Sequence, residues 1–440
     1  MPPRFDLLLR GGVAVLPWGL EQTDIGVRNG RIAALGVPAA ADAAAAIDAA
    51  GLHVLPGLID PHVHLRDPGD PAIETMATGT MGAVLGGVCA VFDMPNTAPP
   101  MIDSASYDNK RAAVEREAWC DVGLYVGATK GNIEALARLE RFYGVCAIKV
   151  FAGSSTGDLL VEDDASIERV LRSGTRRIAF HSEDEYRLRE RRSLYKRGDP
   201  YANHMLWRDE ECAFLGTRRI VGLAQTTGRP VHILHVSTAE ELDYLGEHRA
   251  ESTVEVLVNH LTQMAPDVYE KLGGFGVMNP PIRDRRHWEA SWRAVQDGRV
   301  DTVGSDHAPH DPEKKKLPWP DCPAGLPGVQ TIVPIMLDHV RAGRLSLMRL
   351  ADLMCAGPAR VYGARTKGRI ACGYDADFTL VDLGRRARIE NSALASPSGW
   401  TPFDGMHVTG WPVATIVRGR VVMRDGAMLG RPAGQLVRFH

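Results

Sequence analysis

The chain has 440 residues, enough for a large barrel and a second module. Its 45% hydrophobic and 24% charged residues are typical of a globular protein, and a net charge of −3 gives no basic surplus for binding nucleic acid or an acidic membrane surface. No apolar run has the length or flanks of a signal peptide or membrane-spanning helix, so a cytoplasmic location is expected. The seven cysteines form no C-x-x-C pair, which favours reduced thiols over disulfides or a zinc ribbon.

Short strand patterns occur at both ends of the chain. Residues 1–55 contain FDLLLRGGVAVL and TDIGVRNGRIAAL, punctuated by turn signals such as Asn29-Gly30. The Ala-rich residues 39–50 are interpreted as a connector without a clear structural signal. Strand patterns return in residues 366–440, as GRIACGYDADFTLVDL and VATIVRGRVVMRDGAML. We therefore predict one small β-sandwich module built from both termini.

Residues 56–365 alternate β-branched runs with amphipathic, helix-like stretches. The strand-like runs read HVLPGLID, CAVFDM, DVGLYVG, AIKVFA, RRIAFH, PVHILHV, TVEVLV and DTVGSD. Eight β/α repeats predict an α/β fold, a (β/α)8 barrel of the TIM type. In such barrels the chemistry lies at the C-terminal ends of the strands. The loop at residues 312–328, after the eighth run, either covers this mouth or is solvated.

Candidate metal ligands end several of these runs. They are His62, His64, Lys149, His181, His235 and Asp306. In the H-x-H of the first run, alternation along a strand directs both histidines to the same side. A single strand-end histidine is more often a core residue than a ligand, but His181 and His235 end consecutive repeats. We leave His53 and His232 as structural and His260 as ambiguous.

Lys149 is an unusual candidate because an ammonium repels cations. Burial in an apolar strand lowers a lysine pKa, and a neutral amine can take up CO₂ to become an anionic carbamate that bridges two metals. The alternative is a lysine whose stem lies along the barrel wall while its ammonium reaches the rim. The five other candidate ligands favour the carbamate.

Asp306, within VGSDHAPH, can bind a metal and accept a proton, although an aspartate here is also compatible with a helix N-cap. Imidazole and carboxylate ligands of this kind suit two divalent ions, with zinc expected. Such a pair can activate water and polarise a carbonyl, which predicts hydrolysis of an amide-like bond. The sequence contains no G-x-S-x-G, no P-loop and no dinucleotide fingerprint between strand and helix.

The motifs collectively resemble the amidohydrolase superfamily and, within it, the dihydroorotases. GLIDPHVHLRDPG and DMPNT are similar to the first two strand motifs, and IKVFAGSSTG, HSEDE, HILHVST, NPPIR and SDHAPH to the later ones, over nearly the whole chain. The resemblance implies reversible ring closure of N-carbamoyl-L-aspartate to L-dihydroorotate, in pyrimidine synthesis. It implies that His62 and His64 bind one metal, His181 and His235 the other, that carbamylated Lys149 bridges them, and that Asp306 is ligand and general base or acid.

The resemblance also assigns the substrate. It places the substrate carboxylate at Arg66, Asn96 and His310, and Asn279 beside the ring. A guanidinium suits a carboxylate, which hydantoin and dihydrouracil lack, although Arg66 is also compatible with a surface salt bridge to a neighbouring aspartate. The tyrosine of dihydropyrimidinases is absent from AGSST, just after Lys149.

Two alternatives stay open. Where relatives often have two adjacent histidines this chain has Asn259-His260, which leaves room for a hydantoinase, dihydropyrimidinase or allantoinase activity. The second alternative is a non-catalytic barrel that scaffolds aspartate transcarbamoylase; the intact ligand set speaks against it. The expected partners are a small-molecule substrate and further copies of the chain, as a dimer or tetramer.

Overall fold

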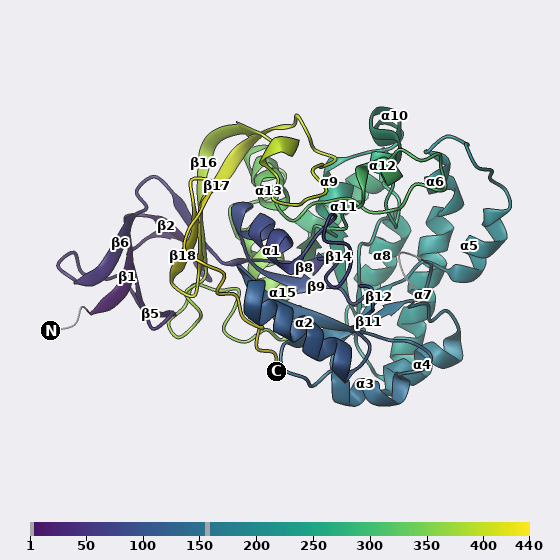
Figure 1. Ribbon diagram of the computed structural model, residues 1–440, viewed down its shortest axis with the longest axis horizontal. Coiled ribbons are helices and arrows are strands. Elements are labelled where there is room, and N and C mark those ends of the chain that lie inside the picture. The colour runs from purple at the N-terminus through teal and green to yellow at the C-terminus, as the bar shows by residue number, and fades with distance from the viewer. Residues whose placement is uncertain (1–3, 155–158) are drawn as a thin grey trace.

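The computed structural model describes residues 4–154 and 159–440 and has an eight-stranded parallel barrel at its centre (Figure 1). Every strand pairs with its neighbour in chain order. A parallel bridge between Val63 and His307 brings the last strand back to the first, and the His64 amide donates to the His307 carbonyl over 2.7 Å. The barrel strands are β8 (Leu58–Val63), β9 (Val88–Asp93), β10 (Asp121–Gly127), β11 (Val145–Phe151), β12 (Ile178–His181), β13 (Val231–Ile233), β14 (Ser252–Leu257) and β15 (Thr302–Gly304).

Helices surround this barrel (Figure 1). Along the repeats they are α1 (Met76–Leu85), α2 (Ser104–Glu117), α3 (Ile133–Leu139), α4 (Asp164–Arg172), α5 (Glu185–Arg192), α6 (Asn203–Trp207), α7 (Glu210–Thr227), α8 (Ala239–Glu247) and α11 (Arg285–Gln296). Shorter or later elements are α9 (Val258–Thr262), α10 (Asp267–Leu272), η1 (Gly273–Gly276), α12 (Pro312–Lys315), α13 (Ile332–Arg341), α14 (Leu347–Ala351), η2 (Asp352–Ala356), α15 (Gly357–Tyr362) and η3 (Asn391–Ala393).

The barrel strands form because their side chains are apolar on both faces. β8 to β12 are buried along their whole length, as parallel strands covered by helices require. Inside the barrel, Phe92 and Tyr125 meet the ring of Tyr362 edge to face, at centroid distances of 5.2 and 5.8 Å. A filled interior leaves only the strand ends for chemistry.

Strands from both termini share a seven-stranded sheet of order β19-β18-β17-β16-β7-β2-β3, and a four-stranded sheet of order β5-β4-β1-β6 lies beyond it (Figure 1). The first terminus supplies β1 (Phe5–Arg10), β2 (Val13–Leu16), β3 (Gly19–Gln22), β4 (Ile25–Arg28), β5 (Arg31–Leu35), β6 (Ala43–Asp48) and β7 (His53–Pro56). The second supplies β16 (Phe378–Arg388), β17 (His407–Val417), β18 (Arg420–Arg424) and β19 (Ala427–Met428). The predicted fold class, a TIM-type barrel with a β-module from both termini, is confirmed.

One local interpretation is corrected. The Ala-rich residues 39–50 contain a strand, β6, which pairs in parallel with β1. Alanine has low β-propensity, so the pattern gave no signal, and pairing with the buried β1 supplies the strand instead.

Candidate active site

A pocket of about 360 Å³ lies at the C-terminal ends of the barrel strands. It gathers nine of the ten predicted site residues, and the tenth, His310, contacts Arg66 and Ala324 of its lining. The predicted residues in the lining are His62, His64, Arg66, Asn96, Lys149, His181, His235, Asn279 and Asp306.

Strand ends place the candidate ligands. His62 and Lys149 lie within β8 and β11, and His181 is the last residue of β12. His235 and Asp306 follow β13 and β15 by two residues, with left-handed backbone at φ 39° and 47°. Non-glycine residues adopt this region at a cost, and such residues cluster at functional sites.

The hydrogen bonds of the first two histidines determine which nitrogen faces the pocket. His62 Nδ1 lies 2.7 Å from a carboxylate oxygen of Glu255, and His64 Nδ1 lies 2.6 Å from Asn96 Oδ1. Both oxygens are acceptors, so both Nδ1 atoms carry the proton in the neutral rings.

The opposite nitrogens then present lone pairs to a carboxylate. His62 Nε2 and His64 Nε2 lie 3.2 and 3.0 Å from Asp306 Oδ1. Three acceptors that converge without a proton between them favour the binding of a cation. These donor atoms therefore fit a divalent ion. Metal-binding histidines commonly have their other ring nitrogen held by a second residue, as Nδ1 of both rings is here.

A second pair of imidazoles meets beside the first. His181 Nδ1 and His235 Nε2 are 2.9 Å apart, and His181 Nε2 lies 2.9 Å from Glu183, itself held by the buried Arg208. Burial lowers the pKa of both histidines, which keeps their rings neutral as metal ligands require.

Lys149 is 1% exposed, with Nζ 4.5 Å from the centre of the Phe151 ring. Within the described residues Nζ has no hydrogen-bond or ion-pair partner. Burial lowers the pKa of the amine to about 7, although the carboxylates of Asp306 and Glu255 oppose this. Much of the amine is therefore uncharged at neutral pH, and only the uncharged amine can form a carbamate.

Burial would favour a protonated Asp306, but the neighbouring imidazoles of His62 and His64 and the amine of Lys149 outweigh it and lower the pKa of this carboxyl. Asp306 is therefore ionised at neutral pH. An ionised carboxylate facing the pocket can both bind a cation and accept a proton.

Arg66 supplies the positive charge of the pocket. Its Nε donates to the Pro309 carbonyl over 3.3 Å, and Nη2 lies 3.3 Å from His310 Nε2, which is also 2.9 Å from the Ala324 carbonyl. Burial lowers the pKa of Arg66 only to about 10, so it stays charged. The neighbouring aspartates accept backbone amides instead, and no ion pair with Arg66 occurs in the described part of the chain.

Two carboxylates of the site were not identified from sequence. Glu255 lies alone among apolar residues in β14, and its side chain is completely buried. Glu183 follows His181 by two residues in HSEDE. The sequence signal for Glu255 is the same as the one for Lys149: a single charged residue within an apolar strand pattern.

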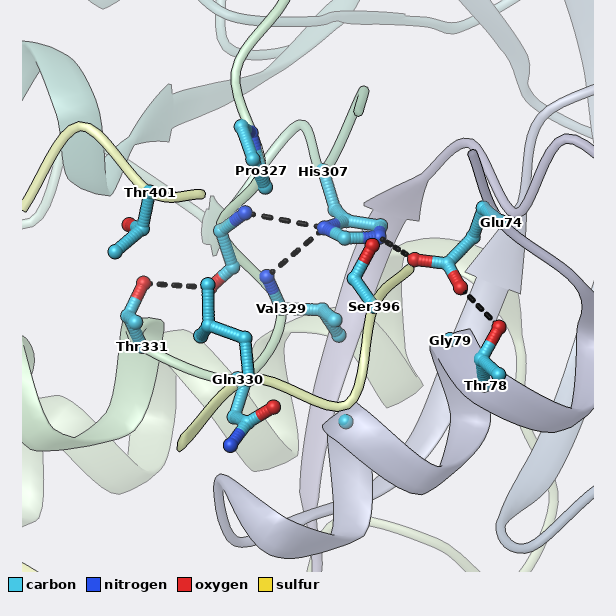
Figure 2. Close-up of a pocket in the computed structure, with 13 residues that line it drawn as sticks. Glu74, Thr78, Gly79, His307, Pro327, Val329, Gln330, Thr331, Ser396 and Thr401 are labelled. Atoms are coloured by element: carbon cyan, nitrogen blue, oxygen red, sulfur yellow. Dashed lines mark hydrogen bonds and ion pairs between the residues drawn. The ribbon is translucent and has the colours of Figure 1, made fainter. Parts of the chain in front are cut away.

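His307, which flanks Asp306, faces a different pocket of about 270 Å³ (Figure 2). Its Nε2 lies 3.0 Å from a carboxylate oxygen of Glu74, and its Nδ1 accepts the backbone amides of Gly328 and Val329. Both nitrogens have protein partners, so His307 is not available to the neighbouring site.

The loop at residues 312–328 covers the mouth in part, because Ala324 and Gly325 line the pocket. Lys315 is fully buried and donates to the carbonyls of Val277, Pro323 and Gly325, whereas Lys314 and Lys316 are exposed. The AGSST stretch after Lys149 includes residues 155 and 156, which lie outside the described residues.

None of the helices within residues 4–154 and 159–440 has the length and hydropathy needed to cross a membrane. The amidohydrolase family profile matches residues 53–422. A dihydroorotase of Methanothermobacter thermautotrophicus is 36% identical over 92% of both chains, and an allantoinase of Deinococcus radiodurans is 34% identical over 98% of both. The solved L-hydantoinase (dihydropyrimidinase) of Arthrobacter aurescens is 27% identical with a TM-score of 0.93, covering 99% of this chain and 100% of its own.

Proposed function

Since the chain belongs to the amidohydrolase family and is a cyclic amide hydrolase, we propose that it interconverts L-dihydroorotate and N-carbamoyl-L-aspartate, in de novo pyrimidine biosynthesis. The observation that carries this choice is the half-buried guanidinium of Arg66 in the pocket, which has no ion-pair partner in the described part of the chain. An anionic substrate would supply such a partner through charge-assisted hydrogen bonds. Dihydroorotate has such a carboxylate, whereas allantoin, hydantoin and dihydrouracil do not.

We propose that two zinc ions bind His62, His64, His181, His235 and Asp306, with carbamylated Lys149 between them. When bound, the ions supply Lewis acidity, activating a water and polarising the scissile carbonyl. Hydrogen bonds to Glu255 and Asn96 fix the ring orientation of His62 and His64, and Glu183 lies 2.9 Å from His181 Nε2.

In this proposal Asp306 moves the proton. During hydrolysis its carboxylate accepts a proton from the attacking water, the ring C–N bond breaks, and the proton passes to the leaving nitrogen. Ring closure follows the same path in reverse, from protonated Asp306. Arg66, Asn96 and His310 hold the carboxylate that does not react, and thereby orient the ring toward Asp306.

Allantoinase is the second candidate, because a relative with that name is 34% identical over nearly the whole chain. Steady-state kinetics on dihydroorotate, allantoin, hydantoin and dihydrouracil with metal-reconstituted protein separates the two. We expect dihydroorotate to have the highest kcat/KM. Faster turnover of an uncharged substrate would contradict the proposal, and absence of both metal and turnover would favour a scaffold.

Arg66→Met provides the matched variant. It should retain the metals and lose about 1.5–3 kcal/mol of transition-state binding on dihydroorotate, as expected for a hydrogen bond to a charged group, while losing little on uncharged substrates. An equal loss on charged and uncharged substrates would show that Arg66 does not bind the carboxylate.

A further inference from the structure

A chain of hydrogen bonds runs from the loop at residues 312–328 to the pocket. Trp319 Nε1 donates to His204 Nδ1 over 3.1 Å, and His204 Nε2 lies 3.0 Å from the Met278 carbonyl and 2.9 Å from Asn279 Oδ1. Trp319 is 1% and His204 3% exposed, so water does not compete for these contacts.

The direction of every bond in this chain is determined. An indole nitrogen can only donate, so His204 Nδ1 must accept. A backbone carbonyl can only accept, so His204 Nε2 must donate to Met278. Both ends of the ring specify the same tautomer, and burial lowers the pKa of His204 to about 3, which keeps the ring neutral.

The fixed tautomer fixes the amide of Asn279. Because His204 Nε2 donates, the nearer atom of Asn279 is its acceptor, Oδ1. The Nδ2 group, with its two N–H donors, is then left for the pocket that Asn279 lines. An amide held this way hydrogen-bonds a carbonyl oxygen and rejects a ring N–H at the same place.

We propose that Trp319 and His204 are positioning residues that make Asn279 a hydrogen-bond donor to the substrate's ring carbonyl remote from the metal ligands. This rests on the proposed cyclic amide substrate. Asn279 lines the pocket without belonging to the set of six candidate ligands, so we assign to it the ring carbonyl that is not under attack. The bond therefore forms equally in ground and transition states, and its loss raises KM more than it lowers kcat.

The first test is a double-mutant cycle between Trp319→Phe and Asn279→Ala. Trp319→Phe removes the indole N–H, and we expect KM to rise roughly five- to tenfold, the effect of one neutral hydrogen bond, with kcat within about twofold. In the Asn279→Ala background, Trp319→Phe should change KM by less than about twofold, because its route to the substrate is gone. Additive effects would overturn the proposal.

The second test distinguishes donor from acceptor. In Asn279→Asp one carboxylate oxygen accepts from His204 and the other faces the substrate carbonyl, so KM should exceed that of Asn279→Ala. If Asn279 instead accepts a ring N–H, the aspartate variant binds better than the alanine variant, and the proposal fails.

Tyr201→Phe is the matched control, because the Tyr201 hydroxyl donates to the Leu317 carbonyl of the same loop over 3.0 Å without contacting His204. It should have the same effect on KM with or without Asn279. All variants are assayed on the cyclic amide that the wild type hydrolyses fastest. A substrate other than dihydroorotate would contradict the proposed function, whereas the coupling between Trp319 and Asn279 is tested on either substrate.

Discussion

Two buried Glu–His pairs contribute a histidine to different pockets, and we propose different roles for them. His62 contacts Glu255 at 2.7 Å in the pocket of the candidate ligands, and His307 contacts Glu74 at 3.0 Å in the neighbouring pocket (Figure 2). Both glutamate side chains are completely buried, and both histidines are at most 2% exposed. Residue type and burial do not separate the two pairs.

The second nitrogen of each ring does separate them. His307 Nδ1 accepts backbone amides from Gly328 and Val329, so the ring is fully satisfied by protein. His62 Nε2 instead lies 3.2 Å from the Asp306 carboxylate, so that the lone pair of the nitrogen faces the negative charge of the carboxylate. An imidazole with two conventional partners is structural, whereas one whose lone pair faces another acceptor is suited to bind a cation.

The largest expected effect comes from substituting the adjacent residues that face the two pockets. Asp306→Asn keeps the size of the side chain but cannot take the proton, so hydrolysis and ring closure should both fall by 10²–10⁴-fold, as is typical of lost general acid–base catalysis. His307→Gln should keep activity per bound metal within severalfold. Rates in both directions and metal content are measured for each variant. A fully metal-loaded Asp306→Asn enzyme with near-normal rates would assign the proton transfer elsewhere.

Glu255→Gln tests the first Glu–His pair. The amide can still accept from His62 Nδ1, but loses the negative charge that orients the ring and raises its basicity. Metal affinity should fall by about 10–100-fold, the usual effect of losing such a partner. Competition with a chromophoric chelator measures this. Unchanged affinity would mean that the environment of His62 is no different from that of His307.

The convergence of the candidate ligands on one pocket could be predicted from sequence because parallel strands impose a simple rule. Each candidate ends an apolar run, and strands in chain order bring those ends to one mouth, so His62, Lys149 and His235 converge without knowledge of any contact. The β-module was predicted for a similar reason, since alternation and turn residues are local signals.

The partners of the ligands could not be predicted in this way. Glu255 is 193 residues from His62, and their pairing depends on the closed barrel. Asp306 and His307 face different pockets, and the left-handed backbone at Asp306, φ 47°, is not specified by any residue type in VGSDHAPH. Likewise, Trp319 and Lys315 are buried by tertiary contacts within a loop whose composition suggests solvent exposure.

Metal uptake should depend on pH through Lys149. Within the described residues, the pocket that contains His307 has no lysine in its lining. With its pKa lowered by burial to about 7, the amine is neutral in about 10% of molecules at pH 6 and about 90% at pH 8. Only the neutral amine reacts with CO₂, so uptake by metal-free protein at constant dissolved CO₂ should accelerate roughly ninefold as pH rises across this range. Burial lowers the pKa of His64 to about 3, so that ligand is neutral throughout.

Lys149→Ala is the control for that measurement. It should lose most activity and at least one metal, and its remaining uptake should not change with pH between 6 and 8. A short carboxylic acid added with the metal can replace the carbamate and partly restore activity. Two tightly held metals with normal turnover in Lys149→Ala would exclude the carbamate.

The smallest expected effect is that of Glu74→Gln, the counterpart of Glu255→Gln. The glutamine carbonyl can still accept from His307 Nε2, and Thr78 Oγ1, which donates to Glu74, retains an acceptor within reach. Only the charge assistance is lost, so the free energy of unfolding should fall by about 1 kcal/mol, seen as a lower urea midpoint. Metal affinity should stay within about twofold of wild type, because Glu74 contacts His307 and Thr78 rather than a candidate ligand. If Glu74→Gln instead loses metal as Glu255→Gln does, the second ring nitrogen does not determine which Glu–His pair belongs to the metal centre.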